Sequence, residues 1–241
     1  MLLKSRISLL RGWSLLAVTS LALAGLFAIL LVLSRIPGME DAVPWPTAFF
    51  HKGLVAHVVL SFAVWYLAVF GCLVQVGSSS ESSLLDKTGL GLATAGTLLL
   101  LIPSLLDRGE PTLNNYIPVI IDPLYYSGLA LLALGILASI LPVIRRTGSG
   151  PDLKAPIYLY VMAIFAFILA EMQLGNQPLS HDYNERLFWG GGHLLQFLNV
   201  ALLLIAWSYL ADLAKTNLPY KIASLWLVAA SLLGLAFYSL W

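Results

Sequence analysis

Runs of apolar residues alternate with short polar breaks along the whole chain. A helix needs about 20 predominantly apolar residues to cross the hydrocarbon core of a membrane. We therefore predict seven membrane-spanning helices, over residues 12–34, 54–76, 88–106, 117–143, 156–175, 187–212 and 220–240. The breaks carry turn-forming residues, such as Ile36-Pro37-Gly38. The expected fold class is all-α, a single polytopic membrane helix bundle over residues 1–241.

Composition agrees with this pattern. Hydrophobic residues make up 59% of the chain and charged residues only 10%, whereas a soluble domain has about 25% charged residues. The net charge of +1 gives no sign of nucleic-acid binding. The first apolar run, from Trp13 to Leu33, is longer than the core of a signal peptide and is expected to be a retained anchor. The single cysteine, Cys72, excludes a disulfide within the chain and is expected to be a small buried hydrophobe.

Basic residues predict the orientation of the helices. If the N-terminus is cytoplasmic, nine of the 13 Lys and Arg residues lie in cytoplasmic segments and four in outer segments. Cytoplasmic loops of membrane proteins carry such an excess of Lys and Arg. The N-terminus is therefore predicted to be cytoplasmic and the C-terminus to lie on the outer, periplasmic side.

Four ionisable residues fall inside the predicted spans, on four different helices and near the outer surface: His57, Asp122, Glu171 and His193. Ionisable groups in hydrocarbon cost roughly 2.5 kcal/mol or more each, so they usually face a protein interior and often mark a functional site. Their common depth predicts a cofactor or ion site in the outer layer.

The helix around His57 is expected to place Ser61 and Trp65 on the same face, because residues four apart are neighbours on an α-helix. A histidine above small residues and an aromatic ring would suit a haem ligand with a wall for the flat macrocycle. The alternative is an interfacial histidine bonded to a loop carbonyl.

Three consecutive glycines at 190–192 precede His193, and Gln196 follows one turn later. Glycines weaken a helix, but they allow another backbone or a flat cofactor to approach closely. The alternative is tight packing between helices through small residues. The intramembrane histidine directly after the glycines favours a site.

The two acids have alternatives of their own. Asp122 precedes Pro123 and either caps its helix or takes part in a site. Glu171 could transfer protons, partner a histidine or bind a cation at the outer surface. His51 and His181 lie in outer segments and are expected to be solvated, although either could help to close a metal site.

Two segments together resemble catalytic subunit I of the haem–copper oxidase superfamily, including its nitric-oxide-reductase and C-type oxidase branches. Ala56-His57 followed by Leu60-Ser61-Phe62-Ala63-Val64-Trp65 is similar to the second helix of that family, whose histidine ligates the low-spin haem. Phe188-Trp189-Gly190-Gly191-Gly192-His193 is similar to the start of the sixth helix, whose histidine ligates the active-site copper. The stretch from Gly109 to Val119 is more loosely similar to oxidase-like proteins of uncharacterised function.

The resemblance implies His57 as a haem ligand and His193 as a metal ligand, with haem b and copper as the cofactors. It also implies other membrane subunits, a periplasmic cytochrome c or copper protein as a partner, and a bacterial inner membrane as the location. It covers only the first half of the family's helices. The paired histidines of the seventh helix are missing between Lys221 and Trp241, and the late helix that supplies further ligands is absent. Oxygen reduction by this chain alone is therefore not expected.

The predicted function is a haem- and/or copper-binding electron-transfer subunit of a larger respiratory or metalloenzyme complex. A partner chain could supply the missing ligands, His57 could hold one haem with a second ligand such as His193, or the sites could be vestigial. The alternatives are a non-catalytic scaffold or assembly subunit and a metal or proton transporter. A retinal protein is set aside, because the lysine near the last span, Lys221, lies at its inner end.

Overall fold

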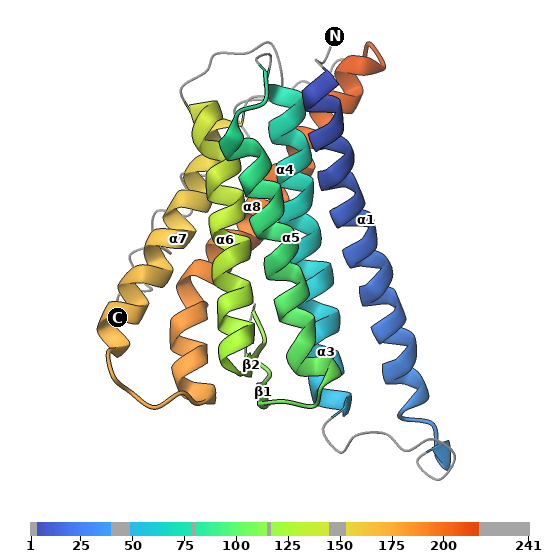
Figure 1. The fold of residues 1–241 in the computed structure, drawn as a ribbon, viewed down its shortest axis with the longest axis vertical. Helices are drawn as coiled ribbons and strands as arrows, with labels where there is room; N and C mark the ends of the chain where they lie inside the picture. The colour runs from blue at the N-terminus through green and yellow to red at the C-terminus, as the bar shows by residue number, and fades with distance from the viewer. Residues whose placement is uncertain (1–3, 40–48, 79–80, 115–116, 145–152, 217–241) are drawn as a thin grey trace.

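The structure of the chain, a computed structural model, describes residues 4–39, 49–78, 81–114, 117–144 and 153–216 (Figure 1). Within these residues, six helical spans are long and apolar enough to cross a membrane. They are α1 (Lys4–Leu33), the continuous helix of α3 (Phe49–Val58), η1 (Val59–Val64) and α4 (Trp65–Gly77), α5 (Leu84–Leu105), α6 (Pro123–Ile144), α7 (Lys154–Leu174) and α8 (His181–Leu213). The chain is a mostly helical, multi-pass membrane protein.

Six of the seven predicted spans correspond to these helices, and the predicted span 220–240 lies outside the described residues. The prediction was wrong at the start of the fourth span, where residues 117–122 are not helical and α6 begins at Pro123. Proline disfavours the helical conformation in the residue before it and suits the first position of a helix. The apolar run before Asp122 instead supplies a strand, which hydrophobicity alone does not distinguish from a helix.

That strand belongs to a short antiparallel hairpin at one end of the bundle. β1 (Glu110–Thr112) pairs with β2 (Val119–Ile121), and Glu110 lies opposite Ile121. The same end of the bundle holds the first turns of α3, α6 and α8 and the last turns of α1, α5 and α7 (Figure 1). We call it the hairpin end, and the opposite end, where α1 begins, the N-terminal end.

Helices α5 and α6 pack backbone to backbone through glycines. A Cβ atom added at Gly96 of α5 would lie 2.6 Å from the carbonyl oxygen of Gly128 on α6. One added at Gly135 of α6 would lie 2.6 Å from the carbonyl oxygen of Gly89 on α5. Small residues allow such close approach of helices in membranes, where lipid provides no hydrophobic force between them. These four glycines form what we call the glycine seam, which fixes α6 against α5.

Helices α7 and α8 pack against each other, and α7 leans away from α6 toward the hairpin end (Figure 1). Further toward the N-terminal end, the Tyr160 hydroxyl of α7 donates a hydrogen bond to the Ala133 carbonyl oxygen of α6 at 2.7 Å. Helices α6 and α7 are therefore joined at the level of Tyr160 and separate from there toward the hairpin end.

The second span contains a π-helical segment, η1. Its backbone hydrogen bonds span five residues instead of four, as in the bond from the Trp65 N–H to the Leu60 carbonyl oxygen. Short π-helical segments are rare and are often found at functional sites. This one begins two residues after His57.

Candidate functional site

His57 lies near the end of α3, half-buried against α1. Its Nδ1 atom is 2.8 Å from the carbonyl oxygen of Ala24 on α1. Because a carbonyl oxygen only accepts, Nδ1 carries the proton and Nε2 of the neutral ring keeps its lone pair. Among the described residues, none bonds to that Nε2. The partner is a helical carbonyl rather than the loop carbonyl of the alternative interpretation, and it fixes the ring as metal-bound histidines are usually fixed.

The regular spacing expected beyond His57 is interrupted by η1. Ser61 lies within the π-helical segment, and its hydroxyl donates to the His57 carbonyl oxygen at 2.7 Å. Trp65 begins α4, with its ring centroid 4.6 Å from that of Tyr66. A π-helical turn holds more residues than an α-helical one, so His57, Ser61 and Trp65 do not form the straight stripe that the sequence predicted.

His193 lies in the fourth turn of α8 and is also half-buried. Its Nδ1 atom is 2.6 Å from the carbonyl oxygen of Trp189, and the two rings are tilted against each other with centroids 4.2 Å apart. Because a carbonyl oxygen only accepts, the bonded nitrogen again carries the proton. In both histidines, Nδ1 is therefore the nitrogen that a backbone carbonyl oxygen holds.

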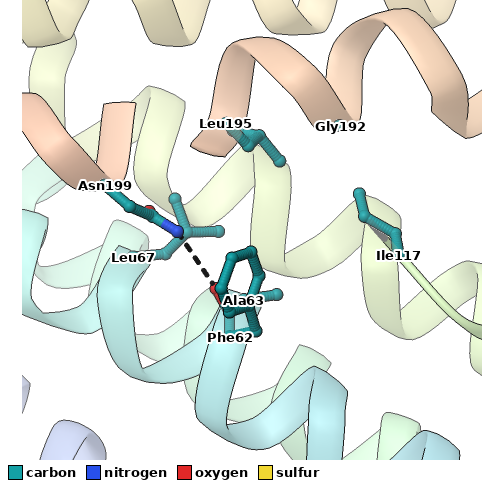
Figure 2. A pocket seen from close by; sticks show the side chains of 7 residues that line it. All are labelled: Phe62, Ala63, Leu67, Ile117, Gly192, Leu195 and Asn199. Carbon is teal, nitrogen blue, oxygen red and sulfur yellow. Dashed lines mark hydrogen bonds between the residues drawn. The ribbon is translucent and has the colours of Figure 1, made fainter. Parts of the chain in front are cut away.

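Two of the glycines before His193, Gly191 and Gly192, have different surroundings. A Cβ atom at Gly191 would collide with the Phe167 ring of α7, which supports the packing alternative for this glycine. Gly192 instead borders a small cavity toward η1, with room of about 10 Å³, close to that of one water molecule (Figure 2). Gln196 lies one turn further along α8 and is half-buried.

Figure 2 shows how this cavity connects the two histidine segments. Phe62 and Ala63 approach it from η1, and Leu195 and Asn199 approach it from α8. The Asn199 side-chain amide donates to the Phe62 carbonyl oxygen at 3.5 Å. The elements that follow His57 and contain His193 therefore face each other across a narrow gap.

Asp122 lies at the start of α6 rather than inside it, which corrects its predicted depth. Its Oδ1 atom accepts from the Leu124 N–H at 2.8 Å, and its Oδ2 atom accepts from the Arg108 Nε at 3.0 Å. The side chain is 6% exposed and that of Arg108 48% exposed. The carboxylate caps α6 and anchors the turn after α5, as the capping alternative predicted.

Replacing Asp122 with alanine should lower the free energy of unfolding by about 1–2 kcal/mol, because the α6 cap and the ion pair with Arg108 are both lost. Thermal unfolding of the purified protein in detergent measures the change. Asp182→Ala, which removes an exposed acid in the first turn of α8, is the matched control. Equal stability of the two variants would contradict the capping role.

Glu171 lies near the hairpin end of α7, exposed, and its Oε2 atom accepts from the Tyr183 hydroxyl of α8 at 2.6 Å. Beside it, the Tyr126 hydroxyl of α6 donates to Asn184 at 2.8 Å, and the Asn184 amide donates to Thr112 of the hairpin at 3.2 Å. These contacts join α6, α7, α8 and β1 at the hairpin end. The sequence pattern gives no signal for the tyrosines or Asn184, since their partners lie far away along the chain.

An apolar groove with about 500 Å³ of space lies between α6 and α7 and is floored by α8. Alanines at 130 and 133 and leucine at 129 line its α6 wall, and Ile164 and Phe167 line its α7 wall. Glu171 borders the same groove. Neither histidine is among the residues that line it.

The four ionisable residues predicted to share a site have separate partners. His57 is bonded to α1, His193 to its own helix, Asp122 to Arg108, and Glu171 to Tyr183. Across the described part of the chain, the structure has no group of three or more His, Cys, Asp or Glu side chains that could hold a metal ion. A metal held by either histidine would need ligands from elsewhere.

The N-terminal end holds a fully buried ion pair that the sequence pattern did not indicate. Arg6 of α1 donates to Gln75 of α4 at 2.7 Å and to Asp86 of α5 at 3.0 Å, and the side chains of Arg6 and Asp86 are 0% exposed. A second guanidinium nitrogen of Arg6 donates to the Glu81 carbonyl oxygen at 3.0 Å. Asp86 also accepts from the Ser83 N–H and hydroxyl in a capping box at the start of α5. We call this set the Arg6 cluster.

The Arg6 cluster had one local signal in the sequence. Serine followed three residues later by an acid, as in Ser83 and Asp86, is typical of a helix N-terminus. Arg6 counted only as one of the basic residues near the N-terminus. Nothing in the local pattern indicated that it would be buried between three helices.

The chain is similar to two bacterial proteins, both described as uncharacterised. No protein-family model matches the chain, and no solved structure matches it. An uncharacterised protein of Aquifex aeolicus (strain VF5) is 28% identical over 214 residues, covering 86% of this chain and 54% of that relative. An uncharacterised protein of Rickettsia prowazekii (strain Madrid E) is 25% identical over 253 residues, covering 89% of this chain and 49% of that relative. The chain thus spans about half the length of the curated relatives it matches, and it is similar over most of its length to part of each of these bacterial proteins.

Proposed function

We propose that the chain is a membrane-embedded electron-transfer subunit in which His57 binds a haem iron and His193 binds a haem or copper centre. The observation that carries the proposal is the bond from His57 Nδ1 to the Ala24 carbonyl oxygen. It holds the ring in one tautomer and leaves Nε2, the usual ligand atom toward haem iron, with its lone pair. The Nδ1 atom of His193 is likewise held by a backbone carbonyl oxygen, that of Trp189 at 2.6 Å, which supports a second ligand position on α8.

The residues fit such a group only in part. Each histidine can provide one ligand, and a bound haem would supply reversible one-electron transfer. The remaining ligands would come from outside the described residues, from a partner chain or from further helices. The curated relatives are about twice as long as their matched part, so they have room for further helices of that kind. The proposal therefore places the chain in a larger respiratory or metalloenzyme assembly.

The proposal includes the orientation of the chain in the membrane. With the N-terminus cytoplasmic, the hairpin end faces the periplasm, and so do the ends of the helices that carry His57 and His193. A periplasmic cytochrome c or copper protein could then exchange electrons with the histidine centres across a short distance. The proposed location is a bacterial inner membrane, and the bacterial relatives support it.

Replacing His57 with alanine should abolish the haem b absorbance of the protein purified with its native partners, because the iron would lose its histidine ligand. Reduced-minus-oxidised spectra and metal analysis of the same sample measure the loss. His51→Ala removes an exposed histidine of the same helix and should leave the spectrum unchanged. His181→Ala, at the exposed start of α8, is the corresponding control for His193→Ala.

A His57→Ala protein with an unchanged haem spectrum would contradict the assignment. A colourless, metal-free complex that assembles normally would favour the non-catalytic scaffold instead. Metal uptake by proteoliposomes that depends on His193 would favour the transporter.

A further inference from the structure

The groove between α6 and α7 is apolar along its length and has one carboxylate at its end. Tyr160 and Ala133, which are joined by a hydrogen bond, line one part of it, and α7 leans away from α6 from there toward the hairpin end (Figure 1). Phe167 and Phe188 meet edge to face at its back, with ring centroids 5.7 Å apart. Glu171 lies at the hairpin end of the α7 wall. This pattern suits a ligand with a long apolar part and a polar head.

The groove is large enough for such a ligand. Its space of about 500 Å³ lies within the range of about 300–1,000 Å³ that is typical of ligand sites. It is open along one side, between helices that cross the membrane, and so it lies where lipid chains surround the protein. A lipid chain is therefore the natural occupant of the apolar part.

Glu171, at the polar end of the groove, determines which head group a ligand there would need. The Tyr183 hydroxyl donates to Glu171 Oε2 at 2.6 Å, and no other described residue bonds to this carboxylate. An ionised carboxylate accepts hydrogen bonds at both oxygens, so Oε1 remains available to a donor. The exposed position of Glu171 at the end of α7 lets a head group approach it. A primary ammonium group provides both the positive charge and the hydrogen bond that this oxygen lacks.

From this combination we infer that the groove binds an aminophospholipid, with an acyl chain along α6 and α7 and the ethanolamine ammonium on Glu171. Phosphatidylcholine has the same charge but no N–H donor, and phosphatidylglycerol has no cation. The site should therefore prefer phosphatidylethanolamine to both. This inference does not depend on a haem or copper at the histidines, since neither His57 nor His193 lines the groove.

The test uses the full chain in detergent, with bound lipid removed and then added back. Native mass spectrometry compares retention of phosphatidylethanolamine, phosphatidylcholine and phosphatidylglycerol that carry the same acyl chains. The wild-type protein should retain phosphatidylethanolamine roughly tenfold more strongly than phosphatidylglycerol, as one charge-assisted hydrogen bond implies. Glu171→Gln should remove that preference. Glu110→Gln, which changes an exposed acid of the hairpin outside the groove, should keep it.

A second variant tests the apolar part separately. Ala130→Phe should fill the α6 wall and lower the retention of all three lipids, while the thermal stability of the protein is unchanged because Ala130 is exposed. Equal retention of the three lipids by the wild-type protein would overturn the inference, and so would a Glu171→Gln protein that keeps the preference. Failure of the wild-type protein to retain any lipid would also overturn it and would point to another occupant, such as the apolar segment 220–240 of this chain.

Discussion

Replacing Arg6 with alanine should destabilise the protein by about 3–5 kcal/mol, because it leaves the Asp86 carboxylate buried without its counter-charge. A charge taken out of water costs several kcal/mol unless its partners compensate for the lost hydration. Here the guanidinium of Arg6 is the compensating cation, and both side chains are 0% exposed. The variant also leaves the Gln75 side-chain oxygen and the Glu81 carbonyl oxygen without this donor.

The apparent melting temperature in detergent measures the effect. For a chain of this size, the expected loss corresponds to a decrease of about 10 °C. Arg11→Ala is the matched control, since Arg11 has the same charge on the same helix but is exposed. A decrease no larger than that of Arg11→Ala would contradict the role of the cluster.

A rescue experiment separates the buried charge from the loss of packing. In the double variant Arg6→Met with Asp86→Asn, no charge remains unpaired, and the asparagine can still accept at the start of α5. Replacement of a buried ion pair by groups of similar volume is often neutral or stabilising. We therefore expect the double variant to recover most of the stability that Arg6→Ala loses.

Replacing Gly96 with leucine should destabilise the bundle by about 3 kcal/mol or more, because the new side chain has no space in the glycine seam. Its Cβ atom alone would lie 2.6 Å from the carbonyl oxygen of Gly128 and 2.6 Å from the amide nitrogen of Leu132. Both are backbone atoms of α6, so no side-chain rotation can relieve the contact. The two helices would have to separate along the seam.

Gly91→Leu provides the control on the same helix. Gly91 is exposed, and a Cβ atom there would meet no atom within 4 Å. Leucine is a better helix former than glycine, so this variant should be as stable as the wild type or slightly more stable. Thermal unfolding and the yield of folded protein after purification distinguish the two variants. If Gly96→Leu were as stable as Gly91→Leu, the close packing of α5 on α6 would be refuted.

For the two histidine segments, the sequence predicted the candidate residues but not the contacts around them. Their position inside apolar spans identified His57 and His193 as candidate ligands. The His57 ring is held by a carbonyl that the sequence does not indicate, that of Ala24, 33 residues away on another helix. The π-helical segment after His57 also has no local sequence signal. It changes which side chains share a face with the histidine.

Six spans, the all-α class and the Asp122 cap could be predicted from the sequence, because each depends on residues close together in the chain. The thickness of the hydrocarbon core sets the length of an apolar run, and a helix cap involves only the first turn. The Arg6 cluster, the glycine seam and the groove were decided by tertiary packing. Arg6 bonds to residues 69 and 80 positions away, and it is buried only because α1, α4 and α5 meet around it. A local pattern gives the charge and size of a side chain, but its burial and its partners depend on which helices pack together.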